Sequence, residues 1–257
     1  MSAPRFQDLW DEQDVPTTLF EKLLANNKLS TPERAEALTQ LARCQGLSNE
    51  FDAAHATLDA IPVADRPIGS VVHIRWLLEK GRVLRSSGKA KDPETKACFV
   101  AAFNDSTDPA QDYFKVDAAH MLAIIDANGR PEGSPLDENW TSAALKLARG
   151  SVNPATQMWA ASLVHNAAWD AMDANNPQQA LALFTEARTL RKRAFDENPT
   201  PKNKRAYRIS RWSVARALRE CGQNQEAYDI QTELWSEEET KPVEEEIAIL
   251  KKALGLE

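Results

Sequence analysis

The sequence predicts an all-α protein built as a stack of helical hairpins. Apolar residues recur at helical spacing in almost every segment, and no convincing alternating strand pattern is present. The stretches Ser162–Ala187 and Ile209–Leu234 have the pattern of two consecutive hairpins of one kind. Each carries alanines at corresponding places, where two antiparallel helices can approach closely. We therefore expect a right-handed α-solenoid of about five hairpins, with one helix before them and a capping helix after them.

Helix starts are marked by a capping residue followed by proline. The capping side chain accepts a bond from an orphan amide, and proline at the next position loses no hydrogen bond. Six dipeptides have this form: Thr31-Pro32, Asp92-Pro93, Asp108-Pro109, Asn153-Pro154, Asn176-Pro177 and Thr200-Pro201.

The elements follow from these marks in chain order. Phe6–Trp10 is expected to be a short packed tail, and Thr17–Asn26 to be the first helix. Five hairpins come next: Pro32–Gly46 with Glu50–Ile61, Ile68–Ser87 with Pro93–Asn104, Pro109–Ala127 with Leu136–Arg149, Pro154–Ala174 with Pro177–Asp196, and Pro201–Cys221 with Gln225–Trp235. Pro242–Leu254 is amphipathic and is predicted to cap the last hairpin. The expected organisation is a single domain over residues 1–257: a tail and helix at 1–29, repeats at 30–240 and a cap at 241–257.

Composition argues against several classes of partner. The 257 residues carry a net charge of −7, so no global basic excess points to nucleic acid. The one basic cluster, Arg188–Arg193 with Lys202–Arg205, is expected to be a solvated face. No apolar run is long enough for a membrane span, and no signal pattern opens the chain. The three cysteines form no CxxC pair, which favours a reducing, cytoplasmic setting.

Signatures of catalysis are missing from the sequence. It has no GxSxG, HExxH, Walker or GxGxxG motif, and only 9 glycines. Its 4 histidines fall on four different predicted hairpins, with no partner at metal-ligand spacing. We therefore expect neither an enzyme nor a bound cofactor or metal.

Small and large residues recur in a pattern that is similar to a known repeat family. The pattern is carried by Gly81, Leu84, Gly88 and Ala97, by Ala168, Ala171, Ala180, Phe184 and Ala187, and by Ala215, Leu218, Gly222, Ala227 and Leu234. In these residues the chain resembles tetratricopeptide (TPR) proteins over roughly residues 30–240. The repeat runs nearer about 40 residues than the usual ~34, as in kinesin-light-chain-like variants. Asp117–Ile124 and Arg211–Arg219 also resemble segments of bacterial TPR proteins of unassigned activity.

The resemblance implies a concave wall formed by the first helix of each hairpin, and a ligand held by side chains on that wall. We call the wall positions that the resemblance selects the wall set: Arg43, Arg82, Arg85, His120, His165, Asn166, Trp169, Trp212, Arg216 and Arg219. Arginine offers paired donors to carboxylate or phosphate, and tryptophan offers rigid apolar area. The expected function is a non-catalytic protein-interaction module that binds an acidic or carboxylate-bearing peptide.

Three alternatives stay open at this point. The wall arginines could pair internally with acids on adjacent helices, such as Glu79, Asp117, Asp170 and Asp173. The array could serve self-assembly through its end helices. A small-molecule sensor or enzyme site could lie where helices converge near His120 and His165.

Overall fold

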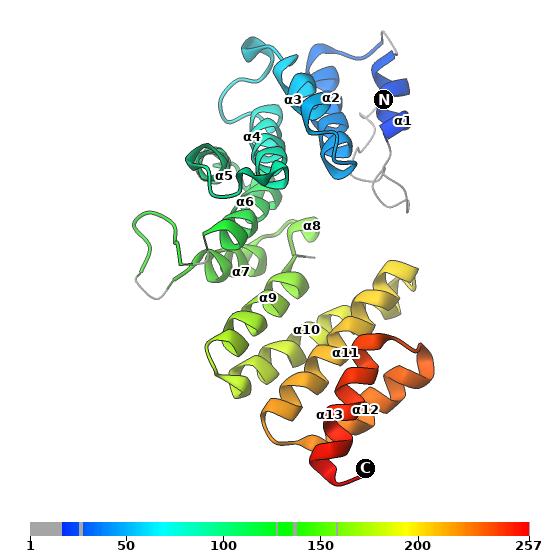
Figure 1. The fold of residues 1–257 in the computed structure, drawn as a ribbon. Coiled ribbons are helices and arrows are strands. Elements are labelled where there is room, and N and C mark those ends of the chain that lie inside the picture. The colour runs from blue at the N-terminus through cyan, green and yellow to red at the C-terminus, as the bar shows by residue number, and fades with distance from the viewer. Residues whose placement is uncertain (1–16, 26–27, 127, 136–137, 158, 257) are drawn as a thin grey trace. The chain divides into compact units, whose positions relative to one another are not determined.

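The computed structural model describes residues 17–25, 28–126, 128–135, 138–157 and 159–256. Within these ranges the secondary structure is helical and contains no strand, as expected (Figure 1). The predicted tail Phe6–Trp10 lies outside the described residues. The chain divides into two compact units, residues 1–153 and 154–257. The predicted single domain over 1–257 stays a prediction.

Unit 1 consists of a first helix and three antiparallel hairpins. Helix α1 (Thr17–Ala25) packs on α2, and each hairpin joins two helices that contact each other. The hairpins are α2 (Thr31–Leu47) with α3 (Phe51–Asp59), α4 (Val71–Leu84) with α5 (Pro93–Asp105), and α6 (Asp112–Ile125) with α7 (Trp140–Gly150). Short helical turns join some successive helices: η2 (Val63–Asp65) precedes α4, η3 (Arg85–Lys89) lies between α4 and α5, and η4 (Pro109–Gln111) precedes α6.

Unit 2 repeats the hairpin twice and closes with one more helix. After the single turn α8 (Pro154–Gln157), α9 (Ala160–Asp173) pairs with α10 (Pro177–Glu197), and α11 (Pro201–Glu220) pairs with α12 (Asn224–Glu237). Helix α10 also packs on α11, which joins the two hairpins. Helix α13 (Lys241–Leu254) packs on α12 and contacts α11, where the sequence places a cap.

The proline marks coincide with helix starts. Asp92 accepts a hydrogen bond from the amide of Glu94, Asn176 from that of Gln179, and Thr200 from that of Asn203. At α2 the cap is Ser30 rather than Thr31, and the Glu33 carboxylate accepts hydrogen bonds from the Ser30 amide and hydroxyl at 2.8 and 2.6 Å. These bonds lower the pKa of Glu33.

Two hairpins differ in detail from the expected pattern. The long helix expected at Pro154–Ala174 is divided, because the chain turns between Thr156 and Trp159 before α9 begins. In the second hairpin Ala97 is exposed, and the buried positions of α5 are Thr95, Cys98, Phe99 and Ala102. The register of α5 is therefore shifted by one residue from the expected pattern.

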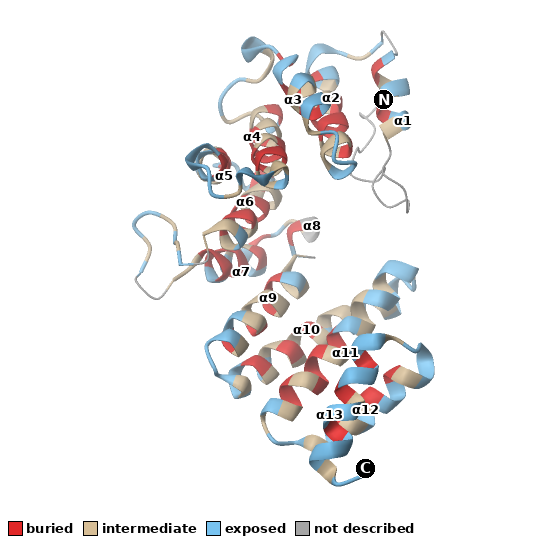
Figure 2. Ribbon diagram, viewed as in Figure 1, coloured by how far each residue is buried: buried red, intermediate tan, exposed pale blue. Residues whose placement is uncertain are grey.

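The core is formed where small residues let helices meet. Ala168, Ala180, Ala215 and Ala227 are all fully buried in unit 2, in the places that the repeated hairpin pattern assigns to them. Figure 2 shows the buried residues as stripes along the helices, with exposed residues on the opposite faces. This packing fixes which face of each helix is free to carry a site.

Candidate functional site

In unit 1, two wall arginines are held by carboxylates within the molecule. The Arg82 guanidinium on α4 pairs with Glu79 on the same helix and with Asp117 on α6. Arg43 on α2 reaches the same Glu79, with Nη1 and Oε1 3.2 Å apart. Burial by itself lowers the pKa of Arg82, but the Asp117 and Glu79 carboxylates raise it above its ordinary value. These ion pairs tie together the first helices of three hairpins.

The two remaining wall residues of unit 1 lie close to this network. Arg85 is half-buried and forms no ion pair with any described residue, and its pKa is lowered by burial and by the charge of Arg82. Burial also lowers the pKa of His120, and this outweighs the nearby Asp117 carboxylate. The His120 ring is therefore neutral at neutral pH.

In unit 2, wall residues from α9 and α11 form one aromatic cluster. The Trp169 ring lies 5.0 Å from the Phe184 ring and 6.3 Å from the Trp212 ring, centroid to centroid. The His165 ring packs 5.2 Å from Phe184, and its Nε2 lies 2.9 Å from the Ser213 hydroxyl. Burial and the charge of Arg191 lower the pKa of His165 to about 4.

Arg216 lies over both tryptophans of this cluster. Its guanidinium carbon is 5.3 Å from the Trp169 ring centroid and 5.5 Å from that of Trp212. Its Nε is buried without a hydrogen-bond partner, and it forms no ion pair within the part of the chain that the structure describes. Cation–π contacts orient this guanidinium, but no carboxylate of the described residues neutralises it.

The last wall residues differ in their surroundings. Arg219 binds Glu246 of α13 through two hydrogen bonds, Nε–Oε2 at 2.8 Å and Nη2–Oε1 at 3.3 Å. It also lies 3.0 Å from a Glu220 oxygen. Arg219 therefore joins the cap helix α13 to α11. Asn166, the other remaining wall residue, is half-buried on α9.

A groove of about 710 Å³ follows the amino-terminal half of α11, between that helix and the junction of α12 with α13. Its apolar lining comes from Ile209, Trp212, Leu234, Pro242 and Val243, and its polar lining includes Lys204, Arg205, Arg208, Glu238 and Thr240. The wall set contains only Trp212 of these residues.

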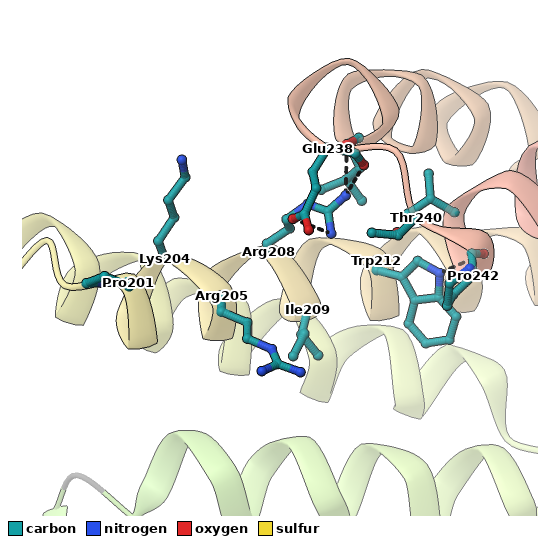
Figure 3. A pocket seen from close by; sticks show the side chains of 11 residues that line it. Pro201, Lys204, Arg205, Arg208, Ile209, Trp212, Glu238, Thr240 and Pro242 are labelled. Atoms are coloured by element: carbon teal, nitrogen blue, oxygen red, sulfur yellow. Dashed lines mark hydrogen bonds and ion pairs between the residues drawn. The ribbon is translucent and has the colours of Figure 1, made fainter. Parts of the chain in front are cut away.

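Helical spacing in the sequence could have pointed to two groove residues that the wall set omits, Arg205 and Ile209. Positions 205, 209, 212 and 216 follow the i, i+4, i+7, i+11 pattern of one helix face. In Figure 3 the side chains of Arg205 and Ile209 project to one side of α11, and the Trp212 ring lies on that side further along. We call these four residues, Arg205, Ile209, Trp212 and Arg216, the α11 stripe. Trp212 therefore belongs to both the groove and the aromatic cluster.

Comparison with known proteins identifies the fold. No family model matches the chain, and no curated protein matches it. The solved structures that match include two crystal structures described as the nearly identical TPR-like repeats of a Podosopora anserina putative kinesin light chain, one of them a substitution variant. The variant shares 17% identity with a TM-score of 0.55, covering 81% of this chain and 96% of that one. The other structure gives 17% identity, a TM-score of 0.54, and coverage of 80% and 95%.

The protein therefore has an all-α, TPR-like helical-repeat fold, as predicted. Repeats of this kind stack into extended surfaces, which generally serve as scaffolds for protein interactions. No described helix combines the length and the apolar character that crossing a membrane requires. Within the described ranges, no three His, Cys, Asp or Glu side chains gather in a way that could hold a metal ion.

Proposed function

We propose that the protein is a non-catalytic interaction module that binds an acidic or carboxylate-bearing peptide on α9 and α11 of unit 2. The observation that carries this proposal is Arg216. Its guanidinium is held over two tryptophan rings and has no ion-pair partner among the described residues. The Nε atom is buried, so a carboxylate would accept hydrogen bonds from the Nη groups, and the rings would contact the apolar part of the same ligand.

The pairing of the other wall arginines supports the choice of Arg216. Arg43, Arg82 and Arg219 are each bound to carboxylates within the molecule. A ligand would have to displace those acids and leave them buried and unpaired, at a cost of several kcal/mol. Arg216 can bind an acid without this penalty. The internal pairing considered for the wall therefore applies to these three positions. Arg85 and Arg216 form no ion pair with any described residue, and of these two it is Arg216 that lies over aromatic rings.

The basic end of the groove supports an acidic partner. Lys204 and Arg205 are exposed and form no ion pair with any described residue. The protein as a whole has a net charge of −7, so a local basic surface would orient an acidic partner toward this groove. We place this activity in the cytoplasm, in line with the reducing setting that the cysteines indicate.

The test is a binding measurement on the full chain with fluorescein-labelled acidic peptides, each made with a free and an amidated carboxyl end. Arg216→Gln should weaken binding about 10- to 100-fold, the range for losing one or two charge-assisted hydrogen bonds. Arg193→Gln is the matched control, because Arg193 is exposed on α10 and pairs only with Glu197 among the described residues. Equal affinity for the wild type and Arg216→Gln, or no binding of any acidic peptide, would reject the proposal.

A further inference from the structure

The loop between α3 and α4 presents apolar side chains to the outside (Figure 1 shows its place). Val63 is 73% exposed and Ile68 is 82% exposed. The residues beside them that are also exposed are Pro62, Ala64 and Pro67. We call residues 62–68 the apolar loop. Exposed apolar side chains are ordinary when they are scattered singly, but a continuous stretch of them is typical of an interaction surface.

The apolar loop is anchored at both ends. The guanidinium carbon of Arg66 lies 3.8 Å from the Trp76 ring centroid, and its Nε donates a hydrogen bond to the Ile61 carbonyl at 3.4 Å. Beyond the other end of the loop, the Gln111 side-chain amide donates to the Gly69 carbonyl at 2.8 Å. A segment fixed in this way loses little conformational freedom on binding, so burial of its apolar side chains contributes more fully to affinity.

Two acidic side chains accompany the apolar loop. Asp59 is exposed at the end of α3, and Asp65 is half-buried within the loop. Neither forms an ion pair with any described residue. The cation within the loop, Arg66, is directed at the Trp76 ring. The loop therefore combines exposed carbon with carboxylates that have no internal counter-charge.

The groove of unit 2 has the complementary character. Its apolar lining includes Ile209, which is 42% exposed, together with Trp212 and Pro242. Lys204 and Arg205 also line it, and Figure 3 shows them pointing to opposite sides of α11. Both are exposed and form no ion pair with any residue that the structure describes. The groove therefore offers an apolar surface beside cations that have no internal counter-charge.

We infer that the apolar loop of one copy of this protein docks in the groove of a second copy. Val63 and Ile68 lie on the apolar lining, and Asp59 and Asp65 face the two cations. A second copy is the partner because this chain carries both surfaces, matched in apolar character and opposite in charge. The inference goes beyond the proposed function, since Arg216 is not among the residues that line the groove.

The two surfaces are different, so the contact between copies is heterologous. Each copy can bind one neighbour through its loop and another neighbour through its groove. Copies joined in this way form a head-to-tail series, which grows unless it closes into a ring. This arrangement distinguishes the inference from a two-fold dimer, in which both copies use the same surface.

The test is sedimentation velocity on the full chain between about 1 and 300 μM, the range in which small interfaces associate. The wild type should self-associate. The loop variant, Val63→Ser with Ile68→Ser, should raise the dissociation constant at least about tenfold, because two apolar side chains no longer leave water. The groove variant, Lys204→Glu with Arg205→Glu, should do the same by repelling the acids of the loop. All four positions are exposed, so both variants should fold, which circular dichroism checks.

Two control variants make matched changes elsewhere in unit 1. Ile124→Ser with Val152→Ser removes two apolar side chains that are 51% and 86% exposed. Lys89→Glu with Lys91→Glu reverses the charge of two exposed lysines and so changes the net charge as the groove variant does. Both controls should self-associate like the wild type.

Mixing the loop variant with the groove variant tests the heterologous contact. The loop variant keeps its groove and the groove variant keeps its loop, so one copy of each can join and the pair cannot grow. The mixture should therefore form one-to-one dimers, while each variant alone associates weakly. A wild type that is monomeric throughout, control variants that lose association to the same extent, or a mixture that forms no dimer would overturn the inference.

The variant Arg216→Gln separates this inference from the proposed function. It should leave self-association unchanged, because Arg216 lies outside the groove lining. If the wild type does not self-associate but acidic peptides still bind through Arg216, the inference fails and the proposed function stands. If copies associate as expected and peptide binding does not depend on Arg216, only the proposed function is rejected.

Discussion

At the scale of single residues, close packing determines which substitutions the core tolerates. Gly81 on α4 faces the fully buried ring of Phe99 on α5. A Cβ added at Gly81 would lie 2.7 Å from two ring carbons of Phe99. A buried aromatic ring between two helices has little room to move, so Gly81 sets how closely α4 and α5 approach.

We expect Gly81→Ala to lower the free energy of unfolding by about 1–3 kcal/mol, the usual cost of overpacking a core. Gly150→Ala is the matched control, because a Cβ there would meet nothing within 4 Å. That change should be neutral or stabilising by up to about 1 kcal/mol, since alanine restricts the unfolded chain. Urea denaturation measures both; equal stability of the two variants would contradict the packing argument.

Histidine 165 gives unit 2 a pH-dependent contribution to stability. Burial and the charge of Arg191 lower the pKa of His165 to about 4, below the ~6.5 of an unfolded chain. Between these values the unfolded state binds a proton that the folded state does not. The stability is therefore fully present above about pH 6.5 and falls as the pH drops toward 4.

Denaturation of the wild type and of His165→Gln at several pH values should isolate this contribution. Their difference in unfolding free energy should change by on the order of 1–3 kcal/mol between pH 6.5 and 4, after allowing for solvent screening. Below pH 4 the difference should stay constant. A difference that does not vary with pH would show that the His165 ring titrates alike in both states.

At the scale of elements, the attachment of α13 depends on a charged contact as well as on its apolar face. Val243 and Leu250 are buried, and Glu246 between them is only 6% exposed. Glu246 pairs with Arg219 of α11, whose side chain is 19% exposed. The sequence predicts the helix and its apolar face, but it leaves open whether Arg219 on the wall is free or paired internally.

Replacing Arg219 by Leu should cost about 2–4 kcal/mol, somewhat below the cost at a fully buried pair, because Glu246 loses its partner. Replacing Glu246 by Leu as well should cost less than the single change. Arg193→Leu tests an exposed pair, Arg193 with Glu197, and should stay within about 1 kcal/mol. Thermal unfolding of the variants would reject the idea if the double change proved the most destabilising.

Much of the element structure could be predicted because local signals carry it. Capping residues such as Asp92 and Thr200 act within a few residues of their own position, so the sequence determines those helix starts. The site could be predicted only in part. Helical spacing tells which face Arg82 and Arg216 lie on, but the partner of a long side chain depends on neighbouring helices. That Asp117 reaches Arg82, and that no described acid reaches Arg216, follows only from three-dimensional contacts.

At the scale of the whole molecule, the buried ion-pair network and the proposed binding site lie in different parts of the chain. The network of Arg43, Glu79, Arg82 and Asp117 belongs to unit 1. The α11 stripe and the groove belong to unit 2. The wall set expected from the sequence therefore divides into residues that hold helices together and residues that are available to a ligand.

Arg82→Met should lower stability by about 3–5 kcal/mol, because Glu79 and Asp117 are 4% and 5% exposed and lose their shared cation. The affinity of the folded protein for the acidic peptides should stay unchanged. Arg130→Met, at an exposed position in the loop before α7, is the control for removing a charge. Calorimetry measures the stability and peptide titration measures the affinity. A loss of affinity comparable to that of Arg216→Gln would show that Arg82 takes part in binding.

The position of the α11 stripe has a consequence for how such a protein can diversify. The residues of α11 that maintain the fold, including Ser210, Val214 and Ala217, lie on a different face from the stripe. Under the proposed function, substitutions at the four stripe positions would therefore alter partner choice while the scaffold is conserved. Exchanging this single helical face between related arrays would transfer ligand preference from one to another, which makes α11 a natural place for selection and for engineering to act.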